Sequence, residues 1–270
     1  MESIHLKRGL QVMNFCAVIL TIIINGLAVI LPINNKTTQE LSDNIPNLFV
    51  PAGLTFSIWS VIYILLIMFT VYQMRDVFSK KPVDMPFLQK ISFWFILASL
   101  GNILWILLWH YEYVTVSLLA MILLLVSLVM IYIRLGIGKT HVSRLEQWCV
   151  HIPFSVYLGW ITVATIANVT AVLVVTGWNR FGLSQDLWAI LIIIIALVLT
   201  LVVLFTKKDA AYSFVIVWAL LGIVIKRLGN DPIYGVQTTI AAVALGALLI
   251  IFISAIATIL LSFIHKPKKA

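Results

Sequence analysis

Eight long apolar stretches constrain the fold of this chain more than any other feature. They cover residues 10–33, 51–74, 91–109, 113–133, 148–176, 187–206, 211–225 and 235–264, and no Asp, Glu, Lys or Arg lies inside them. Most exceed the ~20 residues that a helix needs to cross the hydrocarbon core of a bilayer. Because backbone in lipid must satisfy its own hydrogen bonds, the stretches predict helices. The expected fold class is all-α, a polytopic membrane helix bundle with about eight transmembrane helices. For the short stretch 211–225, a re-entrant segment is the alternative.

The distribution of basic residues predicts the orientation. Cytoplasmic loops of membrane proteins carry an excess of Lys and Arg. With both termini cytoplasmic, 14 of the 18 basic residues fall on the inner side. We therefore expect a multi-pass protein of the cell membrane whose main partner is the lipid bilayer. The net charge of +8 is read as this topology signal, and nucleic acid is not expected as a partner.

Three of the stretches carry aromatic and amide residues at one repeated spacing, three and then four residues apart. The sets are Phe56-Trp59-Tyr63, Asn102-Trp105-Trp109 and Tyr157-Trp160-Ala164-Asn168. This spacing places each set along one face of a helix. In the predicted orientation all three faces reach the outer half of the membrane, beneath the loop 34–50, which becomes a candidate lid. The sets predict an aromatic pocket, with plain helix packing and interhelical amide hydrogen bonds as the alternatives.

Several function classes lack support in the sequence. Proton-coupled pumps and charge-coupled transporters keep ionisable groups inside the membrane, and the stretches contain none of the four charged residue types. Motifs of metalloproteases, α/β-hydrolases and P-loop enzymes are missing, so no catalytic residue and no enzymatic activity are predicted. Cys16 and Cys149 show no ligand spacing, and no metal site is expected. His110, beside Trp109, is either an interfacial histidine or a residue that faces a porphyrin.

These residues resemble the TspO/MBR family of tryptophan-rich sensory proteins. Three blocks carry the resemblance: Pro51 to Trp59 with Tyr63, Asn102 to Trp105, and Tyr157-Leu158-Gly159-Trp160 with Ala164 and Asn168. Ala52 and Leu54 depart from the family pattern, which has Pro and Trp there. The resemblance implies a TspO-like five-helix core at residues 1–176. Residues 177–270 are then an additional three-helix membrane unit with a basic C-terminal tail. Its Gly222, Gly235 and Gly246 could permit close helix approach, although separated glycines are common in membrane helices.

The resemblance and the shared depth of the three faces together suggest a membrane receptor or sensor. The ligand would be a hydrophobic planar small molecule, porphyrin-like or lipid-like, with porphyrin or haem as the candidate tetrapyrrole and no cofactor assigned. A transporter or permease subunit for a small apolar solute or lipid is the alternative, an enzyme acting on a tetrapyrrole is a third hypothesis, and a homodimer is left open. The expected ligand-binding residues are Pro51, Phe56, Trp59, Tyr63, Asn102, Trp105, Trp109, Tyr157, Trp160, Ala164 and Asn168.

Overall fold

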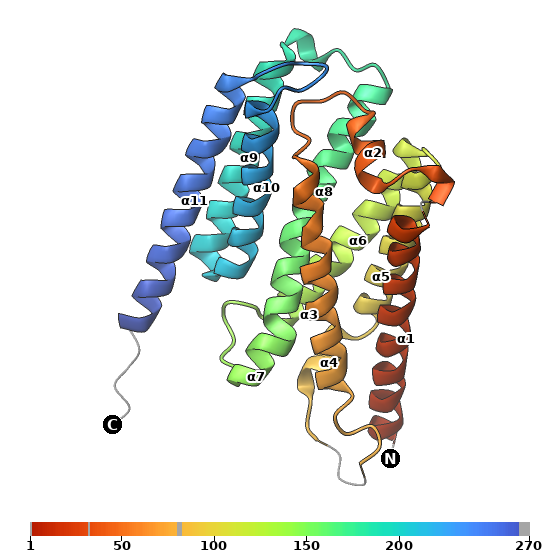
Figure 1. The fold of residues 1–270 in the computed structure, drawn as a ribbon. Coiled ribbons are helices and arrows are strands. Elements are labelled where there is room, and N and C mark those ends of the chain that lie inside the picture. Colours follow the sequence, from red (N-terminus) through yellow and green to blue (C-terminus); the bar gives the residue numbers. More distant parts are fainter. Residues whose placement is uncertain (1, 32, 80–82, 265–270) are drawn as a thin grey trace.

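The computed structural model describes residues 2–31, 33–79 and 83–264, and Figure 1 shows them as a bundle of long helices. Lys80, Lys81 and the basic C-terminal tail lie outside the described residues. The long helices in these ranges are α1 (Glu2–Ile30), α3 (Ile58–Gln73), α5 (Trp94–His110), α6 (Val114–Leu135), α8 (Ile152–Val175), α9 (Gln185–Lys207), α10 (Ala210–Leu228) and α11 (Thr238–Ile264). Short helical segments connect them: η1 (Ile33–Asn35), α2 (Thr38–Asp43), η2 (Gly53–Ser57), α4 (Pro86–Ile91), α7 (Arg144–Glu146), η3 (Gln147–His151) and η4 (Arg180–Gly182).

The prediction of an all-α membrane bundle is confirmed. Seven of the described helices are long and apolar enough to cross a membrane, and α5 is a shorter apolar helix of 17 residues. The short stretch 211–225 belongs to α10, a continuous helix of 19 residues that is among the seven. A re-entrant turn is therefore not needed to explain this segment.

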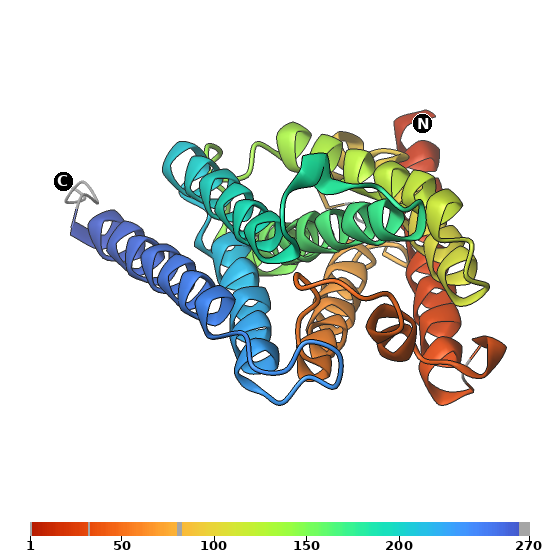
Figure 2. The same ribbon diagram turned by 90° about the horizontal axis from the view of Figure 1, so that it is seen from above.

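Helix order in space follows the chain for much of the bundle. α5 packs along α6, α6 along α8, and α8 along α10, while α1 lies against α5. Figure 2 shows α1 and α11 at opposite ends of the bundle, with α10 between α11 and the earlier helices. The three last helices thus join the first five through α10, which contacts both α8 and η2.

The two ends of the bundle differ in what covers them. The short helix α2 lies at one end, which we call the outer end (Figure 1). The first residues of α1 and the last residues of α11 lie toward the opposite end, which we call the inner end. This arrangement agrees with an even number of crossings, and the cytoplasmic placement of the inner end stays a prediction.

Large apolar side chains cover much of the outside of the bundle. Ile19, Val202 and Ile253 are exposed by 42%, 54% and 64%. Such a surface suits contact with acyl chains, since lipid is as apolar as these side chains. Inside the bundle, Phe69 packs edge-on against Phe95 and Phe154 at ring distances of 5.3 and 5.1 Å. This apolar centre holds α3, α5 and α8 together below the functional site.

Candidate functional site

A cavity lies near the outer end, between α3, α5, α8 and the loop that carries α2. Its free volume is about 50 Å³, well below the ~300–1,000 Å³ of most ligand pockets, so a large ligand would have to displace the lid or some of the rings. We call it the aromatic cavity. Its lining residues are Thr38, Ser42, Ile45, Asn47, Val50, Pro51, Phe56, Trp59, Trp105, Trp109, Trp160, Ala164, Ala167, Asn168 and Ala171.

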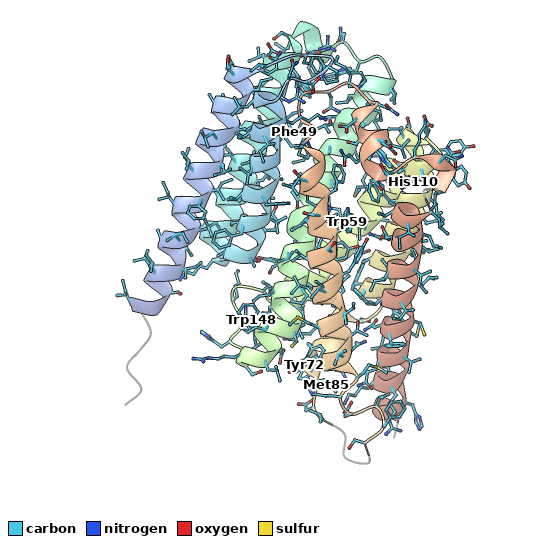
Figure 3. The ribbon with its side chains drawn as sticks, in the orientation of Figure 1. Phe49, Trp59, Tyr72, Met85, His110 and Trp148 are labelled. Atoms are coloured by element: carbon cyan, nitrogen blue, oxygen red, sulfur yellow. The ribbon has the colours of Figure 1, made fainter. Side chains whose placement is uncertain are left out.

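Trp59 is at the centre of the aromatic wall, midway along the bundle in Figure 3. Its ring stacks on Trp105 at 6.2 Å and meets Trp160 edge-on at the same distance. Phe56 adds an edge contact to Trp160 at 6.1 Å, and Trp109 continues the stack from Trp105 at 6.1 Å. Rings from three helices therefore form one connected surface, as the spacing of the aromatic residues predicts.

The structure brings most of the predicted ligand-binding residues to this cavity. Those in its lining are Pro51, Phe56, Trp59, Trp105, Trp109, Trp160, Ala164 and Asn168. Trp109 is only 6% exposed, so it is a buried wall residue rather than an interfacial tryptophan. Tyr63 stacks on Trp59 at 5.6 Å but lies on the side of α3 that faces α1.

Asn102 and Tyr157 lie deeper than the cavity and are not part of its lining. Asn102 is fully buried, accepts a hydrogen bond of 2.6 Å from Asn25, and donates one of 3.0 Å to the Tyr157 hydroxyl. The interhelical alternative for this amide is thus what the structure shows. The ring of Tyr157 supports the floor of the cavity through an edge contact of 6.1 Å with Trp59.

Asn168 is the amide that reaches the cavity wall. Its Nδ2 donates to the Ser117 hydroxyl on α6 at 3.2 Å, and that hydroxyl donates to the Val114 carbonyl at 2.7 Å. These bonds fix the side chain, which also lines the cavity. A ligand there meets an amide whose orientation is already set by a neighbouring helix.

Two indole groups in the wall have no hydrogen-bond partner among the described residues. The Nε1 atoms of Trp105 and Trp160 are both buried, and neither donates to a protein acceptor. A buried donor without an acceptor costs about 1–3 kcal/mol. Both residues line the aromatic cavity, which makes these N–H groups the candidate donors for a molecule bound there.

The lid is held by several polar contacts. Its helix α2 begins with a capping box, in which Thr37 and Glu40 satisfy each other's backbone N–H groups. The backbone hydrogen bond from Thr37 is the first cause that holds the pKa of Glu40 below its usual value. Asp43 forms an ion pair with Lys226 of α10. The capping box stabilises α2 itself, and the ion pair ties the end of the short helix to α10.

His110 belongs to this lid contact rather than to the cavity wall, as its position beside the α2 end in Figure 3 indicates. It is fully buried, with Nδ1 donating to the Ile106 carbonyl at 2.8 Å and Nε2 lying 3.4 Å from the Thr38 hydroxyl. Both ring nitrogens therefore have protein neighbours. The structure does not turn this histidine toward the cavity.

Helix α10 is hydrogen-bonded to the segment from Ala52 to Thr55, which leads into α3. The aromatic pattern of the sequence does not predict this contact. The Ala52 N–H donates to the Gly222 carbonyl at 2.9 Å, and Trp218 Nε1 donates to the Thr55 carbonyl at 3.0 Å. A Cβ atom on Gly222 would lie 1.9 Å from the Thr55 hydroxyl. The close approach expected from the glycines thus occurs at Gly222, whereas Gly246 has nothing within 4 Å.

A groove runs beside the cavity, between α1 and α3. Its free volume is about 500 Å³, and its lining includes Asn25, Gly26, Val29 and Ile30 of α1. Val29 and Ile30 are 64% and 78% exposed, so the groove opens toward the surrounding lipid. Thr38, Phe56 and Trp59 line both spaces. These three residues therefore separate the groove from the aromatic cavity, and Phe56 and Trp59 supply the two rings of this partition.

The chemistry of the cavity wall is neutral. Among the described residues that line it there is no Asp, Glu, Lys, Arg or His. Its rings suit a planar apolar molecule, since aromatic faces stack on one another. A haem iron also needs an axial ligand such as His, Cys, Met or Tyr, and the lining offers none of these. The lining therefore offers aromatic faces for stacking and no side chain for iron ligation.

A polytopic bundle of apolar helices with an aromatic cavity under a lid defines an integral membrane protein. The family model described as TSPO-like protein matches residues 11–257, so the chain belongs to the TSPO-like family. The match extends past residue 176 into the last three helices. No curated protein and no solved structure is similar to the chain at a significant level.

Proposed function

We propose that this TSPO-like membrane protein is a receptor for a hydrophobic planar ligand, which binds in the aromatic cavity. The observation that carries the proposal is the pair of buried, unpartnered indole N–H groups of Trp105 and Trp160 in an otherwise apolar wall. Apolar pockets with a few placed polar groups are typical of small-molecule sites. The polar edge of the ligand would accept from these donors while its ring stacks on Trp59.

The ligand class follows from the same wall. A metal-free porphyrin has an apolar ring with polar substituents, and a lipid-like molecule has carbonyl acceptors on an apolar body. Both suit the two indole donors and the Asn168 amide. Catalysis is not proposed, because the neutral lining provides no acid–base pair.

Entry from the bilayer is the route that we propose for such a ligand. The groove between α1 and α3 opens at lipid-facing residues and ends at Phe56 and Trp59. A rotamer change of these two side chains would join the groove to the cavity. The placement in the cell membrane, with the inner end cytoplasmic, and assembly as a homodimer remain parts of the proposal.

Binding can be tested with metal-free protoporphyrin and the purified full-length protein in detergent. We expect saturable quenching of tryptophan fluorescence, with the dissociation constant at least tenfold higher in Trp105→Ala and Trp160→Ala. Trp148→Ala is the matched control, because Trp148 is 59% exposed and lies near the inner end (Figure 3). Non-saturable quenching, or equal affinities in all three variants, would count against the receptor.

A transporter for a small apolar solute or lipid is the second candidate. The partition formed by Phe56 and Trp59 favours it, because one wall separates a lipid-facing groove from an outer cavity. Flux of a labelled lipid in proteoliposomes distinguishes the two functions. A receptor binds the labelled lipid saturably and moves none of it across the bilayer. A transporter shows net flux of the lipid, and substitution of Trp59 changes that flux.

A further inference from the structure

The buried face of α1 is mainly polar along most of its length. Gln11, Asn14, Thr21 and Asn25 are 0–5% exposed, and they follow one another on one face of the helix. From Lys7 to Asn25 the helix rises about 27 Å, which is close to the ~30 Å of the hydrocarbon core. Polar residues inside a membrane are expensive and commonly functional. This stripe is separate from the aromatic cavity and needs its own explanation.

Hydrogen bonds settle which way the amides of the stripe point. Gln11 Nε2 donates to the Gln73 carbonyl at 2.5 Å and to Asp76 Oδ1 at 2.8 Å. Asn14 Nδ2 donates to Gln73 Oε1 at 3.0 Å. Each amide therefore directs its N–H₂ group at α3 and its oxygen elsewhere. The orientation is fixed because the partners are acceptors.

The oxygen atoms left over share one property. Gln11 Oε1, Asn14 Oδ1 and Thr21 Oγ1 are buried and have no hydrogen-bond partner among the described residues. All three can accept a hydrogen bond. Unpaired acceptors in a membrane interior cost free energy. Buried water molecules commonly satisfy such groups, and each water molecule makes about three hydrogen bonds. The missing partner is therefore a small donor.

The stripe connects two distinct places. Its lower end is the ion pair of Lys7 with Asp76, beside the inner surface. Its upper end is Asn25, which lines the groove and bonds to Asn102 beneath the aromatic cavity. Val18 is the one buried apolar residue between Asn14 and Thr21.

We propose that the polar face of α1 holds a chain of water molecules that runs from the Lys7–Asp76 pair to the groove and the floor of the aromatic cavity. The chain supplies the donors for the three unpaired oxygens. It gives the groove a hydrated route to the inner surface, along which water and protons exchange. The route does not depend on the identity of the ligand or on whether one binds.

Cysteine accessibility to silver ion tests this route. Silver ion is small and reacts with thiolates, which form only where the thiol is hydrated. The full-length protein first receives Cys16→Ser and Cys149→Ala, which remove both native cysteines. Val18→Cys and Thr21→Cys then probe the stripe in proteoliposomes. Ile19→Cys and Ile23→Cys are the matched controls, because these residues are 42% and 51% exposed on the lipid-facing side.

The readout is the fraction of thiol that maleimide still labels after unfolding in dodecyl sulfate. We expect both stripe cysteines to react with silver ion at least tenfold faster than both lipid-facing cysteines. If Thr21→Cys fails to give monodisperse protein, Val18→Cys decides alone, since it probes the apolar gap and removes no polar group. Stripe cysteines that react as slowly as the controls would show a dry helix interface and overturn the proposal.

Discussion

Asn25 on α1 donates a hydrogen bond of 2.6 Å to the side-chain oxygen of Asn102 on α5, across a buried interface. Interhelical bonds of this kind contribute about 0.6 kcal/mol on average and up to about 1.7 kcal/mol in membrane proteins. We expect a double-mutant cycle of Asn25→Ala and Asn102→Ala to give a coupling in this range. The measurement is the free energy of unfolding in mixed detergent micelles. Replacing the second variant by Ser127→Ala, whose hydroxyl bonds within α6, should give a coupling near zero.

Removing only the indole N–H groups tests the donors of the cavity wall. Trp105→Phe and Trp160→Phe keep an aromatic ring but lose the donor that the ligand would use. Each should raise the dissociation constant for protoporphyrin about fivefold to tenfold, which corresponds to roughly 1 kcal/mol for one hydrogen bond. Trp178→Phe, in a different aromatic cluster with Trp188, should leave the titration unchanged. Wild-type affinity in both cavity variants would assign the two indoles to packing alone.

Gly222→Ala tests the contact of α10 with the cavity entrance. The added Cβ would meet the Thr55 hydroxyl at 1.9 Å and the Pro51 Cβ at 3.0 Å, so α10 and this segment must separate. We expect a loss of stability of about 1–3 kcal/mol, as for overpacking, together with weaker ligand binding. Gly246→Ala in α11 is the control, since nothing lies within 4 Å of its Cβ position. Equal melting temperatures of the two variants would contradict the close contact.

Thr37→Ala tests the lid. It removes the capping box of α2, at a cost of about 1 kcal/mol to that short helix. A less stable lid should open more often, so the rate of ligand release should rise about fivefold while the ring contacts stay intact. Stopped-flow fluorescence measures this rate. Ser143→Ala removes a comparable cap from α7, far from the cavity, and its release rate should match that of the wild type.

Asp76 makes stability depend on pH in the acid range. Burial raises the pKa of Asp76, but hydrogen bonds from Lys7, Gln11 and Val83 outweigh it and hold the pKa below its usual value. The folded state therefore favours the carboxylate. Its contribution is complete above the unfolded pKa of about 3.9 and is lost as the pH falls through the lower folded value.

The change from wild type to Asp76→Asn should accordingly be largest near neutral pH. We expect the free energy of unfolding to drop by about 1–3 kcal/mol there, because Lys7 loses its charged partner. The difference should shrink below pH ~4. Unfolding in detergent between pH 3 and pH 7 measures both effects. Asp186→Asn, at an exposed carboxylate, should show neither, and an unchanged acid response of Asp76→Asn would refute the assignment.

The sequence predicts the helices and most of the cavity wall. Charge-free stretches of membrane length force helices, and spacings of three and four place Phe56, Trp59 and Trp160 on defined faces. What spacing does not reveal is which neighbour each residue meets. Asn102 therefore appears as a ligand residue in the sequence but bonds to Asn25 in the structure. The link of Ala52 to Gly222 joins residues 170 positions apart, so a local pattern gives only the small side chain as a hint.

The sequence assigns no role to the last three helices. Division into a core at residues 1–176 and an added unit at 177–270 stays a prediction. The contacts of α10 indicate that the added unit supports the lid and the cavity entrance. Lys226 is paired with the lid, and Trp218 with the entrance to α3. Arg227 is fully buried beside Asp231 although no charge lies within the predicted stretch 211–225. The helix simply continues past that stretch to Leu228.

The bond between the Ala52 N–H and the Gly222 carbonyl has a practical consequence for work with shortened forms of this chain. A fragment that stops after α8 would leave that amide without its acceptor, and the segment at the cavity entrance would lose its contact with α10. Affinities measured on such a fragment would describe a reshaped entrance. The later helices are thus a structural part of the cavity entrance, and reconstitution experiments should retain them.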